Sequence, residues 1–158
     1  MSEDNKPLVH RFIEEIWHKG NLEAIPEFLA PHYVRHTTQT ESGGRDFHGL
    51  ESPTQKIAMV RQAFPDIHYT LDDTMVDGEK VVVRWTCHGT HQGVFRGIAP
   101  TGKRIAYTGI NIYRVVAGKI VERWAETDGV SLLQQLGAIP LQGEVSPKVR
   151  ERSMGERG

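Results

Sequence analysis

The sequence predicts an α+β domain in which a strongly curved antiparallel sheet and a few helices enclose one apolar pocket. Apolar residues recur at helical spacing up to Phe64, and from Ile67 they alternate with polar residues in strand-like segments. A chain of 158 residues has the length of one domain with a single core. Because the helices come first and the strands afterwards, we expect the helices to cover one face of the sheet.

The first two helices are predicted from apolar stripes near the start of the chain. The first stripe holds Leu8, Phe12, Ile13, Ile16 and Trp17. This helix should end at Gly20, and Asn21 can cap a second, short helix. The second stripe holds Leu22, Ile25, Phe28 and Leu29. Residues 37–45 are polar and glycine-rich without a period, so we expect a mobile flap over a site, followed by a loop at 46–51.

The third helix carries the clearest start signal. Ser52 is its predicted cap, Pro53 takes its first position, and Gln55 completes a capping box. Its apolar stripe holds Ile57, Val60 and Phe64. The helix should end before Pro65, since proline disfavours a helical conformation in the residue before it.

Four long strands follow and form an antiparallel meander. The first begins at Ile67, and Asp77-Gly78 is a hairpin signal before the second. The other three strands are expected at residues 80–91, 104–116 and 119–127. Glycines lie in or between them at Gly89, Gly93, Gly97 and Gly109. Such glycines allow the sharp bends that curl a sheet around a cavity.

A last helix and a tail complete the predicted organisation. Asp128 is the expected cap of this helix, which ends at Gly137. Its apolar residues are Val130, Leu132, Leu133 and Leu136. Residues 141–158 are polar and charged, so we expect a disordered C-terminal tail after a single domain at 1–140.

Composition excludes several classes of function. The chain has 19 basic and 20 acidic residues, so no broad field attracts nucleic acid or anionic lipid. It has no apolar stretch of about 18 residues that could span a membrane, and no secretory start signal, so we expect a cytoplasmic protein. Cys87 is the only cysteine, which excludes an internal disulfide and indicates core packing. His88 and His91, three residues apart, would face opposite sides of a strand, so no metal is expected.

Four short motifs in order resemble one known family. They are Gly89-Thr90-His91-Gln92-Gly93, Pro100-Thr101-Gly102-Lys103, Gly118-Lys119-Ile120-Val121-Glu122 and Gln135-Leu136-Gly137. With the helix exit Phe64-Pro65-Asp66 they resemble the SnoaL-like polyketide cyclases, or ester cyclases, of the nuclear transport factor 2-like superfamily. The resemblance implies a cone-shaped α+β barrel, often dimeric or tetrameric, with a deep pocket and no metal or organic cofactor. It also implies intramolecular aldol closure of a polyketide methyl ester.

Two positions depart from the family's chemistry. The resemblance places the catalytic aspartate of the cyclases at Ala125 and a cyclase histidine at Asn111, while a second aspartate matches Asp128. If Asn111 and Ala125 face the pocket, strand alternation places Tyr113 on the face of Asn111 and Arg123 on the face of Ala125, whereas a bulge in either strand would turn Trp124 and Glu126 inward. Alanine carries no proton, so a cyclase mechanism copied residue for residue is not supported.

The candidate site is therefore assembled from polar residues that could replace the missing acid. The candidate catalytic residues are Asp128, His36 and Asn111. The candidate substrate-binding residues are Trp17, Tyr33, Phe64, Trp85, Tyr107, Tyr113, Arg123 and Ala125. Helix capping by Asp128 and a structural role of His36 are the competing interpretations. Arg123 could pair with a buried carboxylate or bind an anionic substrate group.

Three functions remain open at this point. The first is cofactor-independent proton transfer, as in cyclisation or isomerisation, on a small apolar carbonyl or polyketide-like compound in a homodimer or higher homo-oligomer. The second is a non-catalytic module that holds a hydrophobic ligand, which Ala125 favours. The third is epoxide hydrolysis, for which Asp128, Arg123 and Asn111 would have to converge on a water molecule.

Overall fold

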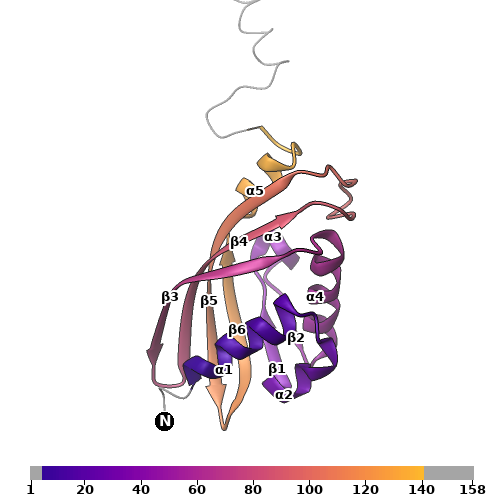
Figure 1. Ribbon diagram of the computed structural model, residues 1–158. Coiled ribbons are helices and arrows are strands. Elements are labelled where there is room, and N and C mark those ends of the chain that lie inside the picture. Colours follow the sequence, from indigo (N-terminus) through magenta and orange to yellow (C-terminus); the bar gives the residue numbers. More distant parts are fainter. Residues whose placement is uncertain (1–4, 141–158) are drawn as a thin grey trace, which may run out of the picture.

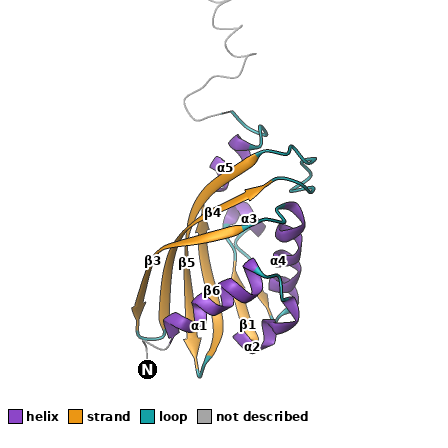
Figure 2. Ribbon diagram, viewed as in Figure 1, coloured by secondary structure: helices purple, strands orange, loops and turns teal. Residues whose placement is uncertain are grey.

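The computed structural model describes residues 5–140, in which one curved six-stranded sheet carries helices on its concave face (Figures 1 and 2). The strand order is β2-β1-β6-β5-β4-β3, so β2 and β3 are the edges of a sheet that stays open. This arrangement confirms the predicted α+β class. The predicted tail at 141–158 lies outside the described residues.

The bounds of the elements follow the chain in the order of Figure 1. The strands are β1 (Leu29–His36), β2 (Asp46–His48), β3 (His68–Asp77), β4 (Lys80–Thr90), β5 (Arg104–Val116) and β6 (Lys119–Thr127). The helices are α1 (Asn5–Phe12), the π-helix η2 (Ile13–His18), the 3-10 helix η3 (Leu22–Ala24), α2 (Ile25–Phe28), α3 (Gln39–Ser42), α4 (Glu51–Ala63) and α5 (Gly129–Gln135). None of the helices described is long and apolar enough to cross a membrane.

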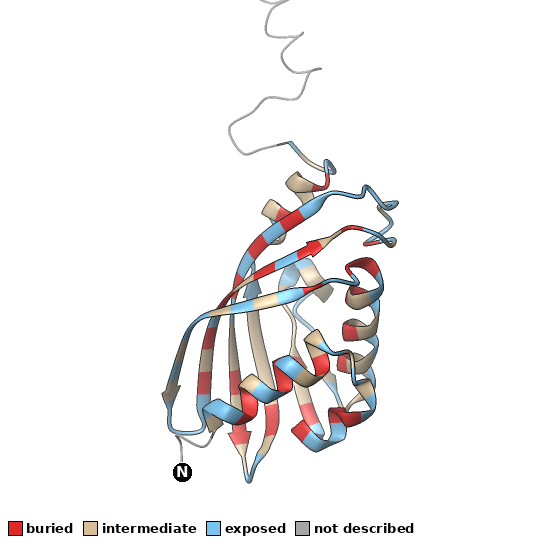
Figure 3. Cartoon of the chain, in the orientation of Figure 1, coloured by how far each residue is buried: buried red, intermediate tan, exposed pale blue. Residues whose placement is uncertain are grey.

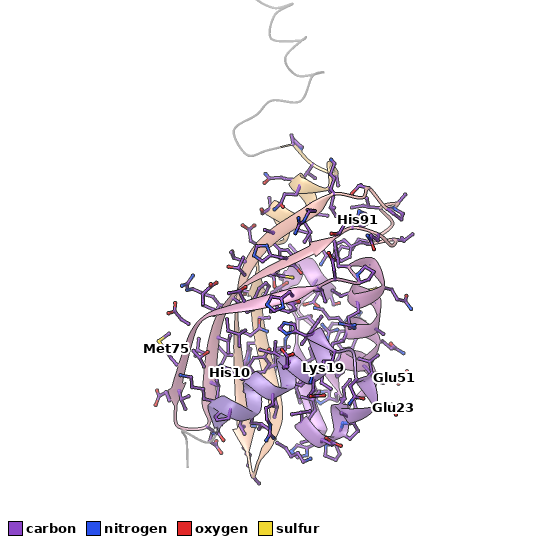
Figure 4. The ribbon with its side chains drawn as sticks, in the orientation of Figure 1. His10, Lys19, Glu23, Glu51, Met75 and His91 are labelled. Atoms are coloured by element: carbon purple, nitrogen blue, oxygen red, sulfur yellow. The ribbon has the colours of Figure 1, made fainter. Side chains whose placement is uncertain are left out.

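Strand alternation builds the core between the sheet and the helices. Buried and more exposed residues alternate along β4 and β5, as Figure 3 shows. The inward residues of β4 are Val81, Val83, Trp85, Cys87 and Gly89. They join one hydrophobic cluster with residues of α1, η2, α2 and α4. At the β3 edge Met75 is 62% exposed and points away from the body of the molecule (Figure 4). The predicted meander of four antiparallel strands, β3 to β6, is confirmed.

Strand β1 is the main element that the sequence did not reveal. The predicted second helix ends at Phe28, and Leu29 already begins the strand. Pro31 interrupts the strand signal because proline cannot donate a ladder hydrogen bond. Strand β1 pairs with β6 in parallel, with an irregular register between Leu29 and Val34, so the sheet is mixed.

Helix α4 begins two residues earlier than expected, and Ser52 is not its cap. The helix starts at Glu51 after Leu50, which makes no side-chain capping bond. The Ser52 hydroxyl instead accepts a hydrogen bond of 3.0 Å from Arg35 Nε. Gln55 donates to Glu51, so the predicted capping box is wrong.

The predicted cap of α5 is confirmed, whereas residues 37–45 contain a helix that was not predicted. Asp128 caps α5 as predicted, since its carboxylate accepts a bond of 3.1 Å from the backbone N–H of Ser131. Residues 37–45, predicted as a flap, contain the short helix α3, and β2 follows within the predicted loop. Thr38 caps α3 by accepting from the backbone N–H of Glu41. Helix α3 thereby holds Glu41 at a fixed place beside β1.

Candidate functional site

Aromatic side chains occupy the concave face between the helices and the sheet. Trp17 of η2 meets the edge of Tyr69, with ring centres 5.2 Å apart. Tyr69 meets Trp85 at 5.0 Å, and Trp85 meets Tyr107 at 5.7 Å, also edge to face. Cys87 lies among them, where burial raises the pKa of its thiol to about 12, so this cysteine is a packing residue. These contacts make the wall apolar.

Gly109 makes room for the largest side chain of this wall. A Cβ atom at Gly109 would lie 2.2 Å from Cζ2 of Trp85, so no residue with a side chain fits there without displacing the ring. Trp85 Nε1 donates to Asn111 Oδ1 at 3.1 Å, and Asn111 Nδ2 donates to the Tyr113 hydroxyl at 2.7 Å. The indole of Trp85, the amide of Asn111 and the phenol of Tyr113 are thus linked by two consecutive hydrogen bonds within an otherwise apolar wall.

The register of β5 and β6 decides which residues face inward. Asn111 pairs with Ala125, and Tyr113 pairs with Arg123. The irregularity lies further along, between Arg114 and Val115, so strand alternation from Asn111 to Tyr113 is intact. Asn111, Ala125 and Arg123 therefore share the inner face, which is the alternative without a bulge.

Four charged side chains from four elements meet at one end of this inner face. Arg35 of β1, Glu41 of α3, Lys56 of α4 and Arg123 of β6 form what we call the inner charge cluster. Glu41 Oε1 accepts from Arg35 Nη1 at 2.5 Å and from Lys56 Nζ. One carboxylate therefore serves two cations.

Arg123 is the member of the inner charge cluster that has an unused donor. Its Nη1 is buried and has no hydrogen-bond partner within residues 5–140. Arg123 is paired with Arg35 of β1 and with Tyr113 of β5, which places its side chain on their face of the sheet, and its charge lowers the pKa of both Lys56 and Glu41. Buried polar groups are nearly always paired, which makes this unpaired donor a mark of a missing partner.

The pKa values of the cluster follow from burial and from the surplus of cations. Burial and the charge of Arg123 lower the pKa of Lys56 to about 8. Burial raises the pKa of Glu41, but Lys56, Arg35 and Arg123 outweigh this effect and leave it below its ordinary value. Burial raises the pKa of the Tyr33 phenol, which stays protonated. Lysine with such a pKa exchanges protons near neutral pH.

The sequence matches one known protein family. The family model described as SnoaL-like polyketide cyclase matches residues 7–136. The chain belongs to the SnoaL-like polyketide cyclase family. No curated protein matches it significantly.

Solved structures agree with the family. AclR of Streptomyces galilaeus, provisionally assigned as a hydroxylase, is 26% identical with a TM-score of 0.79, and the match covers 99% of this chain and 94% of AclR. IdmH of Streptomyces antibioticus, provisionally assigned as a polyketide cyclase, is 31% identical with a TM-score of 0.72, over 84% of this chain and 97% of IdmH. A provisionally assigned polyketide cyclase of Acidithiobacillus ferrooxidans is 27% identical with a TM-score of 0.72, over 84% of this chain and 93% of that one.

Two of the predicted catalytic residues of this SnoaL-like protein lie away from the inner charge cluster. His36 follows Arg35 in β1 and faces the other side of the sheet, stacked on Trp124 with ring centres 4.7 Å apart. Asp128 is exposed, and the only hydrogen bond of its side chain among the described residues is the capping bond from Ser131. Asp128, Arg123 and Asn111 therefore do not form the hydrogen-bonded group that epoxide hydrolysis would need.

One predicted substrate contact, Phe64, lies at the opposite end of the core from the inner charge cluster. Phe64 is buried against Phe95, with ring centres 5.4 Å apart, near the loop after β4. His91 lies in that loop, fully buried, and its Nδ1 accepts from the backbone N–H of Thr101 at 3.1 Å. Within the part of the chain that is described, no three His, Cys, Asp or Glu side chains are grouped as for a metal ion.

An enclosed pocket stays a prediction. A hollow of about 270 Å³ opens on the outside, between η3 and α4. It is lined by Leu22, Ala58, Arg61, Gln62 and Pro65. Lys56 and Glu41 of the inner charge cluster do not line this hollow, and their side chains are 26% and 19% exposed.

Sequence reasoning missed Arg35, Glu41 and Lys56. Lys56 had a usable signal, because it lies three residues after Pro53 and four before Val60, two buried residues of the α4 stripe. Arg35 could have been placed only with β1, and no pattern marks Glu41.

Proposed function

We propose that this SnoaL-like protein catalyses cofactor-independent proton transfer at a small carbonyl compound, leading to cyclisation or isomerisation. The observation that supports it is the buried, unpaired Nη1 of Arg123 beside Lys56, a lysine with a pKa of about 8. Enolate formation needs a base and a hydrogen-bond donor for the oxygen that becomes negative. These two side chains supply both.

The reaction would run through an enolate. Neutral Lys56 Nζ takes a proton from the carbon next to the substrate carbonyl, and the electron pair of that C–H bond moves onto the carbonyl oxygen. Arg123 Nη1 donates to this oxyanion. In a cyclisation the enolate carbon then attacks a second carbonyl of the same molecule, and the Lys56 ammonium returns the proton to the new alkoxide. In an isomerisation the ammonium returns it to another carbon.

Proton exchange in D₂O tests this function without knowledge of the natural substrate. The probe is an aromatic β-ketoester, whose α-hydrogens are followed by NMR. We expect Lys56→Met to slow enzyme-catalysed exchange about 100-fold or more and Arg123→Gln about 100-fold. Arg84→Gln, an exposed change on β4, is the control that should leave the rate unchanged.

Two further variants decide between this assignment and the residues named from the sequence. If His36→Gln or Asp128→Asn abolishes exchange while Lys56→Met does not, the inner charge cluster is not the catalytic site.

A second candidate function, a ligand-binding module without catalysis, is supported by Ala125, which puts no acid opposite Asn111. Probe binding with no exchange in the wild-type protein would favour that module. The cytoplasmic location and the homo-oligomer stay predictions.

A further inference from the structure

The inner charge cluster contains more positive charge than the proposed reaction needs. Arg35, Lys56 and Arg123 are three cations, and Glu41 is the one carboxylate among them. A neutral carbonyl requires hydrogen-bond donors and brings no charge. Charges that leave water are normally paired with opposite charges, so a surplus of two cations in a half-buried group calls for an anion.

The hydrogen bonds show where this anion would bind. Glu41 Oε1 is shared by Arg35 Nη1 and Lys56 Nζ, and Arg35 Nε is taken by the Ser52 hydroxyl. Arg123 Nη1 has no acceptor among residues 5–140. An incoming acid group would therefore bind Arg123, with Lys56 beside it.

We propose that the free protein binds the carboxylate of a small, otherwise apolar acid at Arg123 and Lys56, in the place that the enolate oxygen takes in the proposed reaction, so that such acids compete with the substrate. Arginine pairs with carboxylates through charged hydrogen bonds, which are stronger than those to neutral groups. The apolar part of the acid would lie against Tyr33 and Tyr113, both of them buried beside Arg123. This inference rests on the site of the proposed function and names a class of anionic ligands that bind there in competition with its substrate.

Binding of such an acid should depend on pH through Lys56. The groups that face Lys56 are Glu41 of α3, Arg35 of β1 and Arg123 of β6. Glu41 and the two arginines keep their charge near neutral pH, so Lys56 is the group that changes. Its ammonium attracts the anion below about pH 8 and loses its charge above that value. Affinity should therefore fall as the pH rises through about 8.

The test compares benzoate with benzamide, which has nearly the same shape and no charge. Binding is measured by calorimetry and by NMR titration of the full chain. We expect benzoate to bind about tenfold more tightly than benzamide at pH 7, a preference that Arg123→Gln removes. Lys56→Gln should weaken benzoate binding and abolish its decline above about pH 8. Arg84→Gln, which removes an exposed positive charge on β4, should change neither.

The outcomes separate this inference from the proposed function. Equal affinity for benzoate and benzamide, or a benzoate preference that survives in both Arg123→Gln and Lys56→Gln, overturns it. If Arg123→Gln does not fold, Lys56→Gln and the pH dependence still decide. Benzoate binding without proton exchange would support the inference and reject the proposed reaction, whereas exchange on neutral esters without benzoate binding would do the opposite.

Discussion

The two faces of strands β1 and β6 differ in how their charged side chains are paired, although residues on opposite faces are neighbours in the sequence. Arg35 and Arg123 point inward, whereas the next residues, His36 and Trp124, lie together on the outer face. On the outer face His36 bonds to Asp46 and to Glu122, both at 2.8 Å. On the inner face the cations outnumber their one carboxylate, Glu41.

This difference distinguishes a structural network from a binding site. On the outer face Glu122 accepts from Arg114 as well as from His36. Arg114 Nη1 lies 3.7 Å from Glu79 Oε1, so charges of both signs alternate. Such surface networks contribute little to the free energy of folding. Because their charges are already paired, they leave no unpaired charge for a ligand. The inner face keeps a buried donor without an acceptor among residues 5–140, which costs free energy that a bound acceptor would recover. The inner face is therefore where we expect chemistry.

Gly109→Ala should cause the largest loss of stability, and it changes only the inner face. The added Cβ would lie 2.2 Å from the Trp85 ring, which is buried and hydrogen-bonded to Asn111 and cannot move freely. We expect a loss of about 3 kcal/mol in the free energy of unfolding, measured by denaturant titration. Thr108→Ala changes an exposed neighbour on the outer face and should cost under about 1 kcal/mol. Equal losses in both variants would mean that the two faces do not differ in packing.

Glu41→Gln compares the charges of the two faces directly. Glu41 and Glu122 have side chains 19% and 18% exposed, but Glu41 is paired with the buried Arg35, 8% exposed, whereas Glu122 is paired with Arg114, 35% exposed. We expect Glu41→Gln to destabilise the protein by about 2 kcal/mol and Glu122→Gln by under about 1 kcal/mol.

The pH dependence of the Glu41 effect has a fixed sign. The pKa of Glu41 is lowered in the folded protein, so its contribution is present above its ordinary value of 4.5 and is lost as the pH falls through the folded pKa. Chemical denaturation of wild type and Glu41→Gln between pH 7 and 3 should show the two stabilities converging in acid. A difference that stays constant to pH 3 would reject the charge explanation.

Local patterns predicted much of this fold. Alternation predicted strands β3 to β6 and which of their residues share a face, because the two faces of a strand follow from the sequence alone, whereas the direction of each face came only with the structure. The Asp128 cap was equally visible, since capping involves only neighbouring residues. Strand β1 was not visible, because it contains Pro31 and its partner β6 lies about ninety residues further along the chain.

The site was harder to predict than the fold because its charged residues meet only in three dimensions. Arg35, Glu41, Lys56 and Arg123 come from four elements, and only Arg123 was among the candidates. His36 was chosen for its chemistry, but its face depended on β1 being recognised as a strand. Without that strand the sequence could not assign Arg35 to the inner face and His36 to the outer one.

The smallest expected effect concerns His36 and tests whether the outer face is only structural. Burial lowers the pKa of His36, but its hydrogen bonds to Glu122 and Asp46 outweigh burial and raise it above 6.5. Its contribution to stability is therefore complete below pH 6.5 and is lost as the pH rises through the raised pKa. Because solvent screens this pair of bonds, we expect the difference between wild type and His36→Gln to stay below about 1 kcal/mol and to vanish at high pH. NMR titration of the His36 ring should give a midpoint above 6.5, and benzoate binding should be the same in both proteins. Loss of benzoate binding in His36→Gln would mean that the two faces of the sheet are coupled and that the outer network takes part in function.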